Sequence, residues 1–200
     1  NTGTSASFKN PAGITTDGTN LYVADHGNHK IRKIVISTGA VTTLAGTGSA
    51  GDTDHNTGTS ARFSAPSGIT TDGTNLYVAD KGGHSIRKIV ISTGVVTTLA
   101  GRAQGSNDHN TGTSASFNYP RGITTDGTNL YVADTNNHTI RKIVISTGVV
   151  TTLAGTAGSS GSTDHNTGTS ASFNYPGELT TDGTNLYVSD GENHTIRKIV

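Results

Sequence analysis

The stretch Gly13-Ile-Thr-Thr-Asp-Gly-Thr-Asn-Leu-Tyr-Val-Ala-Asp25 decides the fold of this 200-residue chain, because it is repeated. The same sequence begins again at Gly68 and at Gly122, and a fourth copy with three substitutions follows Gly177. A second phrase, Asn-Thr-Gly-Thr-Ser-Ala, marks the repeat starts at Asn1, Asn56, Asn110 and Asn166, so the period is 54 to 56 residues. Modules of this length cannot bury their own apolar surface and must pack on their neighbours. The sequence therefore predicts a tandem-repeat protein whose core lies between repeats.

Each repeat predicts four short antiparallel strands. In the first repeat, residues 13–25 form two β runs joined by Asp17-Gly18, a pair that favours the positive φ of a hairpin turn. Residues 30–36 are a β-branched run, and Ser-Thr-Gly turns it into a fourth run over 40–45. Alternation in the third run is broken, since Ile34 and Ile36 share a face with Arg32, which predicts a β-bulge near Arg32 or Lys33.

Four antiparallel strands per repeat, in tandem and with glycine-rich connections, are typical of a β-propeller blade. We therefore predict an all-β fold, a single and partial β-propeller domain over 1–200. Its four-stranded antiparallel blades span approximately 1–55, 56–109, 110–165 and 166–200. The last blade lacks its outer strand, because residue 200 follows the third run. Three explanations remain open: a window cut from a propeller of six to eight blades, which we favour, closure by association of copies, or a four-bladed ring with a short edge.

Composition narrows the classes of partner. The chain has 27 glycines, 30% hydrophobic residues, no cysteine, and a net charge of +0 from 14 basic and 14 acidic residues. A balanced charge argues against electrostatic capture of nucleic acid or of an anionic membrane. No apolar run approaches the roughly 20 residues that a membrane helix needs, so we expect no membrane insertion. We expect an extracellular, cell-surface or periplasmic location.

Several spaced elements carry a family resemblance. Pro11-x-Gly-Ile, Leu-Tyr-Val-Ala-Asp, Asn28-His29-x-Ile-Arg-Lys and Thr-Gly-x-Val-Thr-Thr-Leu-Ala-Gly occur in order in this chain. Together they resemble the NHL-repeat β-propeller family, with isoleucine as the third signature residue. The resemblance implies blades around a central axis, commonly six. It does not imply one activity, since relatives include protein-binding and RNA-binding modules, kinase sensor domains and a few lyases.

Comparing the four repeats with one another separates constant connections from varied ones. The first hairpin turns and the Ser-Thr-Gly turns are constant, whereas the second-to-third strand turns and the approaches to the first strand differ. In an antiparallel meander the varied connections emerge together on one side of the disc, which we call the varied face, and loops on a rigid scaffold commonly carry binding. Drift of exposed loops would also explain the variation. The candidate binding residues are Lys9, Asn10, His26, Asn28, Lys81, Asn118, Tyr119, Arg121, Thr135, Asn136, Asn174, Tyr175, Glu178 and Glu192.

Repeated polar residues favour structural roles over chemistry. We expect the histidines of the Asn-His-x-Ile register to make structural hydrogen bonds, and the Asp-His-Asn segments to be turns whose side chains bind backbone groups. The Asp and Arg at the end of the second run and the start of the third, such as Asp25 and Arg32, predict a blade-to-blade ion pair. Asp52-x-Asp54 resembles a calcium loop but lacks the glycine position and distal glutamate of an EF-hand. We predict no metal site, no cofactor and no catalytic residue.

The leading functional hypothesis is a non-enzymatic binding or structural scaffold that presents its varied face to a protein or glycan, within a larger extracellular assembly. Self-association or additional blades of the same polypeptide are the other expected contacts. The alternative is a metal-dependent propeller enzyme of the lyase or lactonase type. An RNA-binding NHL module ranks third, because charge is balanced and exposed aromatic residues are few.

Overall fold

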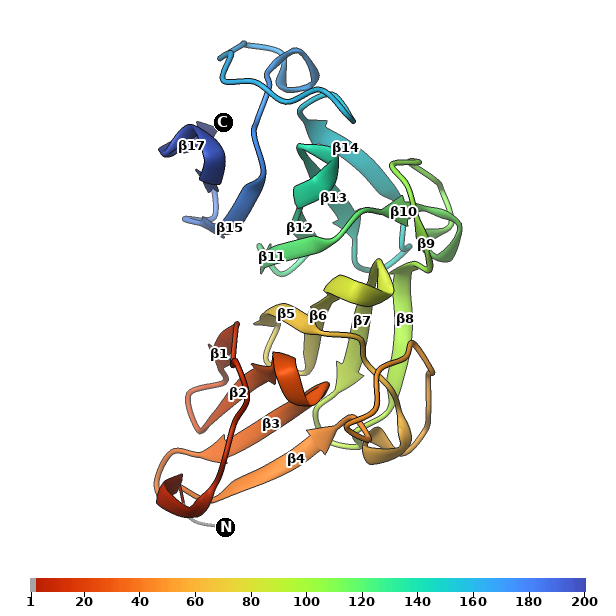
Figure 1. The fold of residues 1–200 in the computed structure, drawn as a ribbon, viewed down its shortest axis with the longest axis vertical. Coiled ribbons are helices and arrows are strands. Elements are labelled where there is room, and N and C mark those ends of the chain that lie inside the picture. The colour runs from red at the N-terminus through yellow and green to blue at the C-terminus, as the bar shows by residue number, and fades with distance from the viewer. Residues whose placement is uncertain (1–2) are drawn as a thin grey trace.

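The computed structural model describes residues 3–200, and its sheets follow the sequence repeats (Figure 1). The first sheet contains β1 (Ile14–Thr16), β2 (Asn20–Asp25), β3 (Lys30–Val35) and β4 (Val41–Ala45). The second contains β5 (Pro66–Thr71), β6 (Asn75–Asp80), β7 (Ser85–Val90) and β8 (Val96–Gly101). The third contains β11 (Pro120–Thr125), β12 (Asn129–Asp134), β13 (Thr139–Val144) and β14 (Val150–Ala154). All are antiparallel meanders in chain order, which confirms the predicted propeller blades.

The fourth sheet has three strands, β15 (Pro176–Thr181), β16 (Leu186–Asp190) and β17 (Thr195–Ile199). The prediction that the last blade lacks its outer strand is confirmed. A short parallel pair, β9 (Ala103–Gln104) with β10 (Ser116–Phe117), lies in the connection between the second and third sheets. The remaining elements are single 3₁₀ turns, namely η1 (Gly3–Ser5), η2 (His26–Asn28), η3 (Gly58–Ser60), η4 (Lys81–Gly83), η5 (Gly112–Ser114), η6 (Thr135–Asn137), η7 (Gly168–Ser170) and η8 (Gly191–Asn193).

The constant hairpin turn is closed by its own side chains. Gly18 has a φ of 86°, as the Asp-Gly pair predicts. The Asp17 carboxylate accepts the backbone N–H groups of Thr19 and Asn20, at 2.8 and 2.6 Å, and the Tyr22 hydroxyl at 2.7 Å. Burial and this hydrogen bond raise the pKa of Tyr22 to about 12. Each turn therefore stays fixed without help from another repeat.

The core lies between sheets, as the repeat pattern predicts. One cluster joins Tyr22, Ala24 and Ile31 of the first sheet to Phe63 and residues of the second sheet. Two further clusters repeat this arrangement between the second and third sheets and between the third and fourth. On β6, Leu76 and Val78 face the preceding sheet whereas Tyr77 and Ala79 face the following one. A blade therefore needs apolar residues on both faces.

An irregularity is present near Arg32, but its extra residue, Leu44, lies on β4 and not on the predicted third strand. Pairing of β3 with β4 shifts register between Ile31 and Arg32, and the equivalent shifts occur before Arg87 and Arg141. Strand β3 keeps regular pairing with β2, so alternation places Ile31 in the core on one face and Arg32 on the other, where it binds Asp25.

Glycines let the first strands of neighbouring sheets, which we call the inner strands, approach one another closely. Gly13 donates its N–H to the Ser67 carbonyl at 3.0 Å, and a Cβ placed on Gly68 would lie 2.4 Å from the Arg121 carbonyl oxygen. The four sheets form an open arc in which the two ends of the chain lie apart (Figure 1). Large apolar side chains are exposed at both ends of the arc, with Ile14 at 60% and Ile196 at 72%. The four described blades therefore do not close into a ring of their own.

Candidate binding surface

The varied connections meet on one face and are tied together within each repeat. The N–H of Gly82 in η4 donates to the Ser64 carbonyl at 2.7 Å, and the N–H of Asn136 in η6 donates to the Asn118 carbonyl at 3.1 Å. The carboxylate that ends the second strand also accepts the N–H of the approach segment, as Asp134 does from Asn118 at 2.7 Å. The loops of the varied face are thus held to one another and to the sheets by hydrogen bonds.

The histidine that follows each of these turns links one blade to the next. Nδ1 of His29 accepts the N–H of Ala65 at 2.9 Å, and Nδ1 of His138 accepts the N–H of Tyr175 at 3.1 Å. His84 and Tyr119 make the same contact at 3.3 Å. These distances confirm a structural role for the first three histidines of the register, while His194, in the last described sheet, is exposed.

The three residues that donate to these histidines, and Asn10 at the equivalent position of the first repeat, have left-handed backbone. The φ angles of Asn10, Ala65, Tyr119 and Tyr175 are 47°, 53°, 53° and 51°. Tyr119 and Tyr175 remain 38% and 46% exposed, and each ring stands edge-on to a histidine, with centroids 4.7 Å apart. Two large aromatic side chains therefore stand out of the varied face at successive blade junctions. Sequence comparison showed the tyrosines but gave no sign of their backbone conformation.

Three candidate residues have structural contacts. Thr135 is buried, and its hydroxyl donates to the Pro176 carbonyl of the next blade at 2.8 Å. In another repeat, His26 occupies the same turn position and reaches Pro66 O at 3.1 Å. The Asn28 amide donates to the Asp25 carboxylate at 2.9 and 3.1 Å. The prediction that Thr135 contacts a partner is wrong. The residue type varies at this turn position because threonine and histidine reach the neighbouring blade in different ways.

The other candidate residues are exposed or half-buried. Those that are exposed are Lys9, Asn10, Tyr119, Arg121, Asn136, Tyr175, Glu178 and Glu192, and those that are half-buried are Lys81, Asn118 and Asn174. Lys81 lies close enough to Arg121 that burial, together with this second cation, lowers the pKa of Lys81. Glu178 of β15 and Glu192 of η8 are acidic and belong to the fourth repeat. The varied face is thus basic beside Tyr119 and acidic in the fourth repeat.

The repeated arginines lie behind this face, in the body of each blade. Arg141 is fully buried, with Nη1 2.8 Å from Asp134 and the guanidinium carbon 5.0 Å from the centre of the Phe117 ring. The predicted blade-to-blade pairing is wrong for these carboxylates, because Asp134 and Arg141 lie on adjacent strands of one sheet. A different carboxylate joins the repeats, since Asp108 pairs with Arg141 at 2.7 Å. The sequence did not distinguish the two aspartates.

The Asp-His-Asn segments are turns, as predicted. Nδ1 of His55 accepts the N–H of Thr57 at 2.9 Å, and His109 and Thr111 repeat this contact. Asp54 pairs with Arg87 at 2.7 Å. Burial raises the pKa of Asp54, but hydrogen bonds from Arg87 and Thr98 outweigh it and hold the pKa below its ordinary value. Over residues 3–200, no three His, Cys, Asp or Glu side chains gather as a metal site would require. In the same range, no helix is long and apolar enough to cross a membrane.

Acid is expected to weaken the histidine links between blades. Burial lowers the pKa of His84 and of His138, with Asp190 opposing the shift at His138. The unfolded chain, whose histidines titrate near 6.5, then binds more protons than the native state, so this stability is complete above about pH 6.5 and is lost as pH falls through the lowered pKa values. The double variant His84→Asn, His138→Asn keeps an acceptor and tolerates left-handed backbone but does not titrate.

Urea unfolding at pH 7 and pH 5 measures this effect. The wild type should lose more stability than the double variant between the two pH values, by on the order of 1 kcal/mol per hydrogen bond. Burial raises the pKa of Asp80 to about 7 and that of Asp134 to about 6, although the neighbouring arginines act to lower both pKa values. These aspartates titrate in the wild type and in the double variant alike. An equal acid sensitivity of the two proteins would contradict the assigned role of the histidines.

The chain is similar in sequence and in fold to known repeat proteins. The NHL repeat profile matches residues 117–143. NHL repeat-containing protein 2 from Bos taurus is 36% identical over 161 residues, which are 72% of this chain and 22% of that protein. An auxiliary nutrient binding protein from Bacteroides ovatus superposes with a TM-score of 0.75 at 21% identity, over 98% of this chain and 49% of that one. A streptogramin B lyase superposes with a TM-score of 0.64 at 16% identity, over 98% of this chain and 53% of the lyase. The chain therefore spans about a fifth of its curated relative and about half of these solved structures.

Proposed function

Because this chain belongs to the NHL-repeat β-propeller family, we propose that it is a non-enzymatic binding scaffold whose varied face takes a protein or glycan partner. The observation that carries the proposal is the pair of exposed tyrosines held in left-handed backbone at successive blade junctions. Rigid aromatic side chains give a large contact area at a low cost in conformational entropy, and they are enriched at binding sites.

The choice of tyrosine at these positions is not what stability alone favours. All four repeats have positive φ there, and the first repeat uses Asn10, a residue type that adopts this conformation readily. A bulky residue in the same conformation is strained, with a cost on the order of 1 kcal/mol or more. Tyr119 and Tyr175 accept this strain, and beside their contact with a histidine they stay 38% and 46% exposed. The exposed part of each ring is available to a partner.

The surroundings of the tyrosines suggest the chemistry of the partner. Lys81 and Arg121 flank the first junction, so an acidic group of a protein or a carboxylated sugar would be attracted there. Each tyrosine ring meets a histidine ring at 81° and stays 38% or 46% exposed, so part of its surface is free to contact a partner. The nutrient binding role named for the Bacteroides ovatus protein supports a binding role, and we extend the proposal to an extracellular or periplasmic location.

A glycan array probed with the labelled chain tests the proposal, followed by a titration of the strongest ligand. The double variant Tyr119→Asn, Tyr175→Asn should weaken binding by at least about tenfold, the loss expected when two stacking contacts of about 1 kcal/mol are removed. Its stability should not fall, because asparagine occupies the same place in the first repeat. The matched control is Ser92→Ala with Ser146→Ala on the constant face, where both serines are exposed.

Equal ligand binding by the tyrosine variant and the wild type would remove the varied face from consideration. Metal analysis of the purified protein separates the enzymatic alternative, because stoichiometric calcium or zinc would favour a metal-dependent lyase or lactonase. Tight retention of RNA in a filter assay at low salt would favour the nucleic-acid module instead.

A further inference from the structure

The two blade junctions that carry an exposed tyrosine are built alike but differ in charge. Tyr119 meets His84 and Tyr175 meets His138, in both cases with ring centroids 4.7 Å apart and ring planes at 81°. We call these the Tyr119 junction, between the second and third repeats, and the Tyr175 junction, between the third and fourth. Because the rings are placed alike, the residues around them can be compared position by position.

The first difference lies at the first residue of the 3₁₀ turn. In the Tyr175 junction this residue is Thr135, which is buried and donates its hydroxyl to the Pro176 carbonyl of the next blade at 2.8 Å. In the Tyr119 junction it is Lys81, which is half-buried. Burial, together with the charge of Arg121, lowers the pKa of Lys81. Within residues 3–200 the Lys81 ammonium group makes no hydrogen bond or ion pair.

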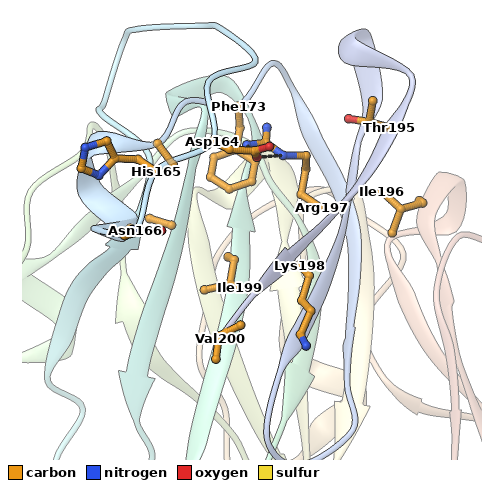
Figure 2. Close-up of a pocket in the computed structure, with 13 residues that line it drawn as sticks. Asp164, His165, Asn166, Phe173, Thr195, Ile196, Arg197, Lys198, Ile199 and Val200 are labelled. Atoms are coloured by element: carbon orange, nitrogen blue, oxygen red, sulfur yellow. Dashed lines mark hydrogen bonds and ion pairs between the residues drawn. The ribbon is translucent and has the colours of Figure 1, made fainter.

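The second difference follows the proline of the inner strand, where the Tyr119 junction has Arg121 and the Tyr175 junction has Gly177. Most arginines of the chain bind an aspartate. Figure 2 shows one of them, Arg197, bound to Asp164 in a groove of about 610 Å³ beside β17. Arg121 is exposed, and its guanidinium has no such partner among the described residues. Lys81 and Arg121 are therefore two neighbouring cations without a counter-ion.

A pair of cations beside an aromatic ring favours an anionic ligand. Like charges repel one another, and burial of Lys81 removes part of the water that would screen the repulsion. A carboxylate placed between the two cations replaces repulsion with attraction. The guanidinium of Arg121 can also bind a carboxylate through two parallel N–H groups, which adds a preferred geometry. The Tyr175 junction has neither cation, so the acidic group of a ligand belongs at the Tyr119 junction.

The rest of the varied face favours a sugar over a peptide as the carrier of the carboxylate. Protein interfaces have an apolar and well-packed centre. Apart from the two tyrosines, the large apolar side chains that are exposed in the described residues lie at the ends of the arc or next to a constant turn, namely Ile14, Ile36, Ile196 and Val200. A sugar ring needs less, because it stacks its C–H groups on one aromatic ring and directs its hydroxyls to polar neighbours such as the exposed Asn136.

We propose that the ligand of the varied face is a glycan that contains a uronic acid, with the carboxylate between Lys81 and Arg121 and the adjoining sugar ring on Tyr119. The inference rests on the binding role proposed above, and it adds the class of ligand and the junction that recognises its charge. A neutral part of the same glycan lies over Tyr175. The exposed Glu178 of the following strand repels a second carboxylate there.

Isothermal titration of the 200-residue chain with a hyaluronan hexasaccharide, in which a uronic acid alternates with a neutral amino sugar, tests the site. The methyl ester of the same hexasaccharide is the matched ligand, because it keeps every ring and loses every charge. We expect saturable binding of the acid, at least about tenfold tighter than binding of the ester. The difference should disappear at about 1 M ionic strength, where the Debye length is about 3 Å.

The double variant Lys81→Thr, Arg121→Gly gives the Tyr119 junction the residues of the Tyr175 junction. It should bind the acid and the ester equally, with the affinity that the wild type has for the ester. It should still unfold cooperatively, because a threonine at this place can donate to the proline carbonyl as Thr135 does. The matched control is Arg62→Ala with Lys198→Ala, which removes two exposed cations outside both tyrosine junctions and should keep the preference for the acid.

Four outcomes would overturn the inference. Equal affinity of the wild type for the acid and the ester would remove the carboxylate, and the binding role of the tyrosines would stand if Tyr119→Asn, Tyr175→Asn weakened binding of both ligands. A preference for the acid that the Lys81→Thr, Arg121→Gly variant retained would place charge recognition elsewhere. Hexaglutamate that bound as tightly as the acid, and lost affinity in the same variant, would assign the cations to a protein partner. The absence of saturable binding of the acid would reject the uronic acid, whereas the glycan array decides separately whether the varied face binds another ligand.

Discussion

Replacing Arg141 by methionine is expected to lower the free energy of unfolding by about 3–5 kcal/mol. The guanidinium and the Asp134 carboxylate are both fully buried and lie 2.8 Å apart. Arg141 also donates to the Ser116 carbonyl at 2.9 Å and covers the Phe117 ring. Without it, the carboxylate and the carbonyl keep their burial and lose their strongest donor. Urea unfolding followed by circular dichroism measures the loss.

Two further variants separate the charge from the packing. Adding Asp134→Asn to Arg141→Met should recover part of the lost stability, because the pair is then neutral and Asn can still accept the Asn118 N–H. Arg197→Met should cost less than Arg141→Met, because its side chain is 11% exposed and borders the open groove. A loss below about 1 kcal/mol for Arg141→Met would show that the buried pair contributes little.

Features that depend on neighbouring residues in the sequence were predictable. The Asp17-Gly18 turn and the alternation around Tyr22 each follow from a few adjacent residues, and the structure confirms both. The bulge predicted on the third strand lies instead on β4, opposite Ile31 and Arg32. Repetition strengthened the two confirmed predictions, because each pattern recurs in the same order. The place of the core between sheets followed from the repeats as well, since no single repeat has enough apolar residues to enclose a core.

Features that depend on the neighbouring blade were not predictable. Asp134 and Asp108 both bind Arg141, yet only one of them belongs to the same sheet, and no local pattern tells which. The turn residues His26 and Thr135 look like loop variation, but both reach a proline carbonyl of the next blade. Tyr119 has left-handed backbone, and its N–H binds His84, a residue 35 positions away. Variation between repeats therefore includes alternative ways of joining blades as well as the exposed residues of the proposed binding surface.

Replacing Gly122 by alanine is expected to lower stability by about 1–3 kcal/mol, the usual cost of overpacking. A Cβ on Gly122 would lie 2.5 Å from the Gly177 carbonyl oxygen and 2.8 Å from the Glu178 Cα. Both are backbone atoms of the next inner strand, so relief requires β11 and β15 to move apart. Such a movement would loosen the apolar cluster between the third and fourth sheets, which contains Leu179 of β15. Thermal unfolding monitored by circular dichroism would report the loss.

Glu178 supplies the matched control, because it occupies in β15 the place that Gly122 has in β11. It is exposed, and the Ser189 hydroxyl accepts its N–H at 2.8 Å and donates to its carbonyl at 3.1 Å. Glu178→Ala should therefore change stability by less than about 0.5 kcal/mol. A similar loss in Gly122→Ala and Glu178→Ala would disprove the close-approach argument.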